Sequence, residues 1–153
     1  MNRNFTPVAI ETGLWLGRAP AAPEDFAMLR DLGVQDVLTL QTEEEASGSG
    51  ILPSLAFRIA MAHGMALHRV GIPDLSPTAL KALAGRAAGL LLDLRRRQRR
   101  VFVHCAVGLN RSPTVVAAYL ALSRGMDPDD ACRYVKDRHR CAPDRDAVEA
   151  TLR

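Results

Sequence analysis

The chain has 153 residues, 48% hydrophobic and 24% charged, with a net charge of +3; this composition is typical of one globular domain, and its small basic excess favours anionic partners without identifying one. No apolar run approaches the ~20 residues that cross a bilayer, and the opening segment MNRNFTPVAIETG lacks the apolar core of a secretory signal, so we expect neither a membrane partner nor export. The three cysteines stand at unrelated spacings, which argues against a disulfide scaffold and predicts a reducing, cytoplasmic location.

Short apolar segments alternate with helical patterns in the first half of the chain. The sequence predicts a strand over 14–17, a helix over 23–32 and a strand over 34–40. The next ten residues, QTEEEASGSG, are acidic and then rich in glycine and serine, which predicts an exposed loop over 41–50. A helix over 52–64, closed by its final glycine, follows this loop.

The second half continues the alternation. The segments MALHRVGI (65–72) and VFVH (101–104) predict strands, and between them a long helix begins at Ser76 and ends in RRRQRR. We interpret that basic run as a solvated helix end, with nucleic-acid contact the less favoured reading. Further helices are predicted from about Ser112, from 128 and from about 144. The pattern predicts an α/β fold, one domain over 1–153 with a central, mostly parallel sheet flanked by helices.

The segment VHCAVGLNRSPTVVAAYL (103–120) places Cys105 at the carboxyl end of a buried strand and Arg111 at the start of a helix. Such sheets bind ligands beyond the carboxyl ends of their strands. A loop that leads into a helix N-terminus gathers backbone N–H groups at the positive end of the helix dipole, which forms an anion cradle. Ala106 and Gly108 let the backbone approach the anion, and the guanidinium of Arg111 matches two phosphate oxygens. The segment therefore predicts a phosphate-binding loop between strand and helix.

A cysteine at the base of such a cradle is a candidate nucleophile. A helix N-terminus and nearby cations favour the thiolate, which is the form that attacks. We therefore expect Cys105 to attack the phosphorus of a bound phosphate, and the hydroxyl of Ser112 to donate to its sulfur. The alternative interpretation is a buried structural cysteine beside a surface arginine.

The arrangement His-Cys-x5-Arg-Ser, formed by His104, Cys105, Arg111 and Ser112 around Gly108, resembles the cysteine-based protein tyrosine phosphatases, and most closely their dual-specificity subgroup. The resemblance extends to LWLGRAP and LRDLGVQDVLTL, which look like the first strand, helix and second strand of that core. It implies a phosphocysteine intermediate and no metal or other cofactor. It also implies that the loop binds phosphate through its consecutive residues Ala106, Val107, Gly108, Leu109, Asn110 and Arg111, with His104 as a buried supporting residue.

A phosphatase also needs an acid that protonates the departing oxygen. The segment VGIPDLSP supplies Asp74, on a loop between a strand and a helix and 31 positions before Cys105, a separation like that of the dual-specificity group. We expect Asp74 to be this general acid. The alternative is that Asp74 is only a turn residue at the entry to a helix, where Pro-Asp is common.

The resemblance implies a phosphorylated protein or peptide as substrate. The chain has no room for the insert that deepens the pocket of tyrosine-specific relatives, so we expect phosphotyrosine to be hydrolysed fastest, with phosphoserine and phosphothreonine also accepted. Asn110 is shared with RNA 5′-triphosphatases of this fold, but these typically lack an acid such as Asp74. Lipid phosphatases place lysines in the loop, whereas AVGLN has none. An alternative of another class is a non-catalytic phosphate-binding module, in which loss of the cysteine, arginine or acid would be expected.

Other features carry less information. The acidic residues 43–45 are candidates for one rim of the site, and the sequence does not show whether they contact substrate. Cys132 and Cys141 are expected to be core or surface cysteines, and a redox role for either stays open. The sequence leaves the oligomeric state open as well.

Overall fold

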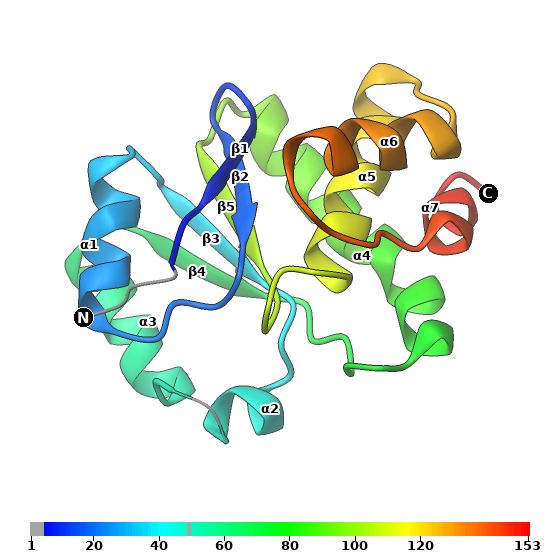
Figure 1. The fold of residues 1–153 in the computed structure, drawn as a ribbon. Coiled ribbons are helices and arrows are strands. Elements are labelled where there is room, and N and C mark those ends of the chain that lie inside the picture. Colours follow the sequence, from blue (N-terminus) through cyan, green and yellow to red (C-terminus); the bar gives the residue numbers. More distant parts are fainter. Residues whose placement is uncertain (1–4, 49) are drawn as a thin grey trace.

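The computed structural model describes residues 5–48 and 50–153; the first four residues of the predicted domain and position 49 of the predicted loop lie outside this part. Five strands form one sheet in the order β1-β2-β5-β3-β4 (Figure 1). The parallel strands are β2 (Leu14–Gly17), β5 (Val101–His104), β3 (Asp36–Thr39) and β4 (Ala66–Arg69). The edge strand β1 (Val8–Glu11), which the sequence analysis did not predict, pairs with β2 in the antiparallel direction. The predicted α/β class with a mostly parallel sheet is confirmed.

Both faces of the sheet are covered, as the uninterrupted apolar strands require. Along β5, Val101 and Val103 pack into one apolar cluster, whereas Phe102 packs into the other. The first cluster lies under α4 (Pro77–Arg96), α5 (Arg111–Arg124), α6 (Pro128–Arg138) and α7 (Arg145–Thr151), and the second under α1 (Pro23–Asp31) and α3 (Pro53–Ala62) (Figure 1). In the described part of the chain, no helix combines the length and apolar character needed to span a membrane.

The prediction of a loop over 41–50 is wrong in its middle, where α2 (Glu43–Ser47) forms. The Thr42 hydroxyl accepts a hydrogen bond of 3.1 Å from the backbone N–H of Glu45, which caps the helix. Three glutamates in the first turn favour the positive end of the helix dipole, and Ala46 is buried. The glycine and serine residues that suggested a loop only end this helix, since Gly48 is its C-cap.

Arginines of the basic run RRRQRR at the end of α4 contact other parts of the fold. Arg95 donates to the backbone oxygen of Gly13 and to the carboxylate of Glu11. Arg99 pairs at 2.7 Å with the buried carboxylate of Asp36, and Arg100 lies over the ring of Trp15. These contacts join the end of the helix to the amino ends of the strands, at the opposite edge of the sheet from Cys105. They favour a structural role for the run over a nucleic-acid surface.

Candidate active site

The loop between β5 and α5 lies at the carboxyl ends of the parallel strands, at the lower edge of the sheet in Figure 1. Its carbonyl groups are bonded from outside the loop. The oxygen of Ala106 accepts from Ala19 N–H (3.0 Å), that of Gly108 from His139 Nε2–H (2.8 Å) and that of Leu109 from Ala142 N–H (2.7 Å). By contrast, no backbone N–H from 106 to 111 has an acceptor among the described residues. The loop therefore leaves consecutive donors for an anion.

Gly108 shows why this loop needs a glycine. Its φ is +79°, a left-handed conformation that other residues adopt only with strain. A Cβ atom at this position would also lie 2.8 Å from the carbonyl carbon of Gly17. The end of β2 thus packs directly against the loop, and any side chain at 108 would distort the cradle.

Cys105 lies at the base of the cradle and is only 2% exposed. Its Sγ is 3.3 Å from the hydroxyl oxygen of Ser112 and accepts a hydrogen bond of 3.5 Å from the backbone N–H of the same residue. Ser112 is in the first turn of α5 and is fully buried. When the sulfur is a thiolate, both groups donate to it, so the start of the helix can stabilise its negative charge.

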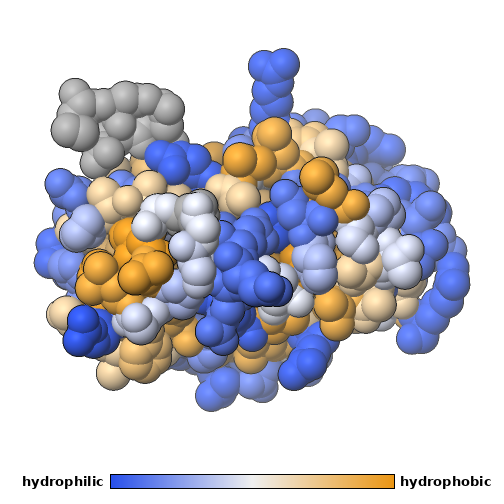
Figure 2. Space-filling model, turned by 90° about the horizontal axis from the view of Figure 1, so that it is seen from below, coloured by the Kyte–Doolittle hydropathy of each residue, from blue (hydrophilic) through white to orange (hydrophobic). Residues whose placement is uncertain are grey.

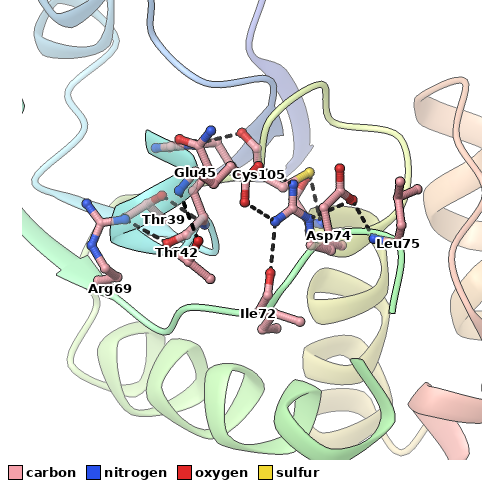
Figure 3. Close-up of polar contacts among 12 residues, drawn as sticks. Thr39, Thr42, Glu45, Arg69, Ile72, Asp74, Leu75 and Cys105 are labelled. Atoms are coloured by element: carbon pink, nitrogen blue, oxygen red, sulfur yellow. Dashed lines mark hydrogen bonds and ion pairs between the residues drawn. The ribbon is translucent and has the colours of Figure 1, made fainter. Parts of the chain in front are cut away.

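Arg111 is 2% exposed and held by a two-pronged ion pair. Its Nη1 and Nη2 each donate to one carboxylate oxygen of Glu45 at 2.7 Å, and Nη1 also donates to the backbone oxygen of Ile72 at 2.9 Å (Figure 3). Burial opposes the charge of Arg111, but the hydrogen bonds that it donates to Glu45, together with the nearby charges of Cys105, Glu45 and Asp74, outweigh burial and raise the pKa of the guanidinium. The same bonds lower the pKa of Glu45. Both groups are therefore charged at neutral pH. The Nε–H and one Nη2–H of Arg111 are not bonded to Glu45.

Asp74 follows β4 and reaches the same place. Its Oδ1 is 3.3 Å from Nε of Arg111 and accepts a hydrogen bond of 3.0 Å from the backbone N–H of Leu75. The Asp74 side chain is 48% exposed, so it can meet a ligand that enters from solvent. The structure thus brings together Cys105, Arg111, Ser112 and Asp74, all of which were candidates from the sequence.

His104 supports the loop from below. Its ring stacks on Phe102, with the ring centroids 5.7 Å apart, and its Nδ1–H donates to the backbone oxygen of Cys105 at 3.0 Å. Burial lowers the pKa of His104 to about 4, so the ring is neutral at pH 7. Among the described residues its hydrogen bond goes to this backbone oxygen and not to Sγ of Cys105. His104 therefore orients the loop without adding a charge to it.

The segment after α6 clamps the outside of the loop, a role that the sequence analysis missed. Besides the bonds from His139 and Ala142, the Asn110 side chain donates to the backbone oxygen of Ala142 at 2.9 Å. Asn110, the residue shared with RNA 5′-triphosphatases, thus faces this segment. No pattern in the sequence marks these contacts, because about thirty residues separate the partners.

The other two cysteines are free and differ from Cys105 in their surroundings. Burial raises the pKa of the Cys141 thiol to about 11, and burial also raises the pKa of Cys132. Both thiols are protonated at neutral pH, which makes them poor nucleophiles.

Comparison with known proteins identifies the family of the chain. A family model described as "Dual specificity phosphatase, catalytic domain" matches residues 14–152. Phosphoglucan phosphatase LSF1 of Arabidopsis thaliana is 29% identical over 135 residues, which is 88% of the chain and 23% of that relative. Dual specificity protein phosphatase 1 of the same plant is 29% identical over 136 residues, 89% of the chain and 62% of the relative. The chain thus spans less than two thirds of these curated relatives.

Solved structures share the fold. The crystal structure of PTPMT1 superposes with a TM-score of 0.76, covering 95% of this chain and 91% of that one, at 21% sequence identity. At this identity the likeness establishes the arrangement of the sheet and helices, whereas the substrate depends on the side chains around the cradle.

Proposed function

The chain belongs to the dual-specificity phosphatase family, and we propose from this premise that it hydrolyses phosphotyrosine, and also phosphoserine and phosphothreonine, through a phosphocysteine intermediate. One observation carries the proposal. The loop that follows Cys105 carries backbone N–H groups that have no acceptor among the described residues. The sulfur of Cys105 contacts two donors of Ser112, its hydroxyl and its backbone N–H. This arrangement suits a tetrahedral anion placed directly over a nucleophile.

In the first step the Cys105 thiolate attacks phosphorus, so that an S–P bond forms while the bond from phosphorus to the ester oxygen breaks. Asp74 donates a proton to the departing oxygen, so that the leaving group departs as a neutral alcohol or phenol. Asp74 is suited to this role because its carboxyl group is half-exposed beside Arg111, at the open side of the cradle. The backbone N–H groups and Arg111 stabilise the charge that spreads over the three remaining phosphate oxygens.

In the second step water attacks the phosphocysteine. Asp74, now ionised, accepts a proton from that water, the S–P bond breaks, and inorganic phosphate is released. The sulfur leaves as a thiolate that receives hydrogen bonds from the hydroxyl and backbone N–H of Ser112. This contact favours sulfur as a leaving group and restores the starting enzyme.

Glu45 is a positioning residue in this proposal. Its carboxylate occupies one side of the Arg111 guanidinium with two hydrogen bonds of 2.7 Å. Nε–H and the second Nη2–H of Arg111 are not bonded to Glu45, and they are the two donors that would bind two phosphate oxygens, which is the geometry that distinguishes arginine from lysine. The carboxyl group of Asp74 lies 3.3 Å from Nε and would shift aside as the phosphate enters.

The substrate class is tested by phosphate release from a panel of five compounds. The panel holds matched phosphotyrosine and phosphothreonine peptides, a phosphoglucan, an inositol phospholipid and an RNA 5′-triphosphate. We expect the highest kcat/KM on phosphotyrosine, followed by phosphothreonine. A higher value on the glucan, lipid or RNA than on both peptides would contradict the protein-substrate assignment. Release from none of the five would support the non-catalytic module instead.

A further inference from the structure

Leu75 is the most exposed large hydrophobic residue of the described chain, with 93% of its surface in contact with solvent. It follows Asp74 directly and donates its backbone N–H to the Asp74 carboxylate at 3.0 Å (Figure 3). Its φ is +58°, in the left-handed region where a residue with a Cβ is strained. Neither packing nor backbone conformation therefore accounts for a leucine at this position.

The position of Leu75 is defined by the chemistry of its neighbour. A general acid must reach the oxygen that departs from phosphorus, within about 2.6–3.2 Å. In the proposed function that acid is Asp74, and Leu75 lies directly beside it (Figure 3), so we expect Leu75 to lie near the departing group. An apolar side chain here meets the part of the substrate that carries the phosphate rather than the phosphate itself.

Two further apolar side chains are exposed on the cradle loop. Val107 is 63% exposed and Leu109 is 49% exposed. Val107 also lines a hollow of about 240 Å³ whose other walls include the apolar residues Ala19, Pro20 and Ala21 and the polar residues Arg18 and Gln41. Figure 2, which views the molecule from the side of the carboxyl ends of the strands, shows hydrophobic patches set among charged side chains on this face.

We propose that Leu75, Val107 and Leu109 form an apolar rim that selects phosphate esters by the apolar surface around the ester. This inference rests on the proposed function and narrows its substrate to a phosphotyrosine ring flanked by apolar side chains. Burial of such groups against the rim is favourable at about 25 cal/mol per Å². The hydroxyl groups of a glucan or an inositol would instead lose hydrogen bonds to water against side chains that offer none.

The test compares two phosphotyrosine peptides that are identical except for leucine or asparagine on both sides of the phosphotyrosine. A phosphoglucan serves as the third substrate, and inorganic phosphate as an inhibitor that fills the cradle without reaching the rim. The variants are Leu75→Asn and Leu75→Gly, because both residues accept the left-handed conformation and so remove apolar surface without adding strain. Leu152→Asn is the control, since Leu152 is 43% exposed at the end of α7.

We expect the wild type to prefer the leucine-flanked peptide, and both Leu75 variants to reduce that preference about fivefold to twentyfold through KM. The inhibition constant of inorganic phosphate should stay constant, and Leu152→Asn should match the wild type. The rim proposal would be contradicted if both variants kept the wild-type preference for the leucine-flanked peptide, or if the phosphoglucan were turned over faster than either peptide. Either result would leave the proposed phosphatase activity in place. If no substrate released phosphate, both the proposed phosphatase function and the proposal of an apolar rim would be contradicted.

Discussion

Glu45 and Arg111 form a two-pronged ion pair with both hydrogen bonds at 2.7 Å, although 66 positions separate them in the sequence. The pair joins α2, which follows β3, to the first residue of α5, which follows the cradle loop. The only cation within the proposed phosphate-binding loop is therefore oriented by a helix from another part of the chain.

Replacement Glu45→Gln should lower both activity and stability. The neutral amide has one acceptor oxygen and one donor NH2 group, so it cannot accept from both Nη1 and Nη2 as the carboxylate does, and Arg111 loses its fixed orientation and its balancing charge. We expect kcat/KM to fall about 10- to 100-fold and the free energy of unfolding to fall by about 1–3 kcal/mol. Glu44→Gln, an exposed neighbour in the same helical turn, is the matched control.

The stability difference should also depend on pH. Because Arg111 lowers the pKa of Glu45 below its ordinary value of 4.5, the pair stabilises the fold above that pH. The contribution is lost as the pH falls through the lowered pKa of the folded state. Urea unfolding of both proteins between pH 3 and 7 measures this effect, and a difference that grows on acidification would contradict it.

Cys105 should be alkylated selectively. The hydroxyl and backbone N–H of Ser112 contact its sulfur at the start of α5, whereas burial raises the pKa values of Cys132 and Cys141 and keeps them protonated. Iodoacetate at pH 7 should inactivate the enzyme with one modification, which peptide mass spectrometry locates at Cys105, and inorganic phosphate should slow it. Cys105→Ser should have no measurable turnover. Equal labelling of all three cysteines would argue against an activated nucleophile.

Asp74→Asn should separate the two kinds of leaving group. An amide cannot donate the proton that a poor leaving group needs, so we expect turnover of alkyl phosphates and phosphotyrosine to fall about 10²–10⁴-fold. Esters of acidic phenols need less protonation and should be affected less. Asp93→Asn, an exposed change on α4 that disturbs only the pair with Arg97, is the control. If Asp74→Asn keeps the full rate on phosphotyrosine, another group is the acid.

His104 should make the protein sensitive to mild acid. Its pKa is lowered by burial from 6.5 to about 4, so protonation is opposed in the folded state and allowed in the unfolded state. Stability attributable to the neutral ring is therefore complete above pH 6.5 and decreases as the pH falls toward 4. The His104 signals in an NMR titration should stay unchanged between pH 8 and 5. A midpoint near 6.5 would contradict the buried, neutral ring.

The local part of the site could be predicted from the sequence. Cys105, Arg111 and Ser112 lie within eight consecutive residues, so a buried strand, a glycine and a helix start are enough to place them around one anion. Asp74 could be predicted as well, because it follows a parallel strand and the carboxyl ends of such strands meet at one edge of the sheet.

The remaining contacts depended on the tertiary structure. Glu45 lies in a segment whose glycine and serine residues suggested a loop, and only the Thr42 cap and the contact with Arg111 show why a helix forms there. The bonds from His139 and Ala142 to the cradle loop join residues about thirty positions apart. Hydrophobic periodicity and turn chemistry report on neighbours in the chain, so the sequence by itself determined the strand, the loop and the candidate nucleophile. Which distant carboxylate meets Arg111 was decided by the packing of α2 below the sheet, because side chains that pair across the fold leave no periodic signal in the sequence.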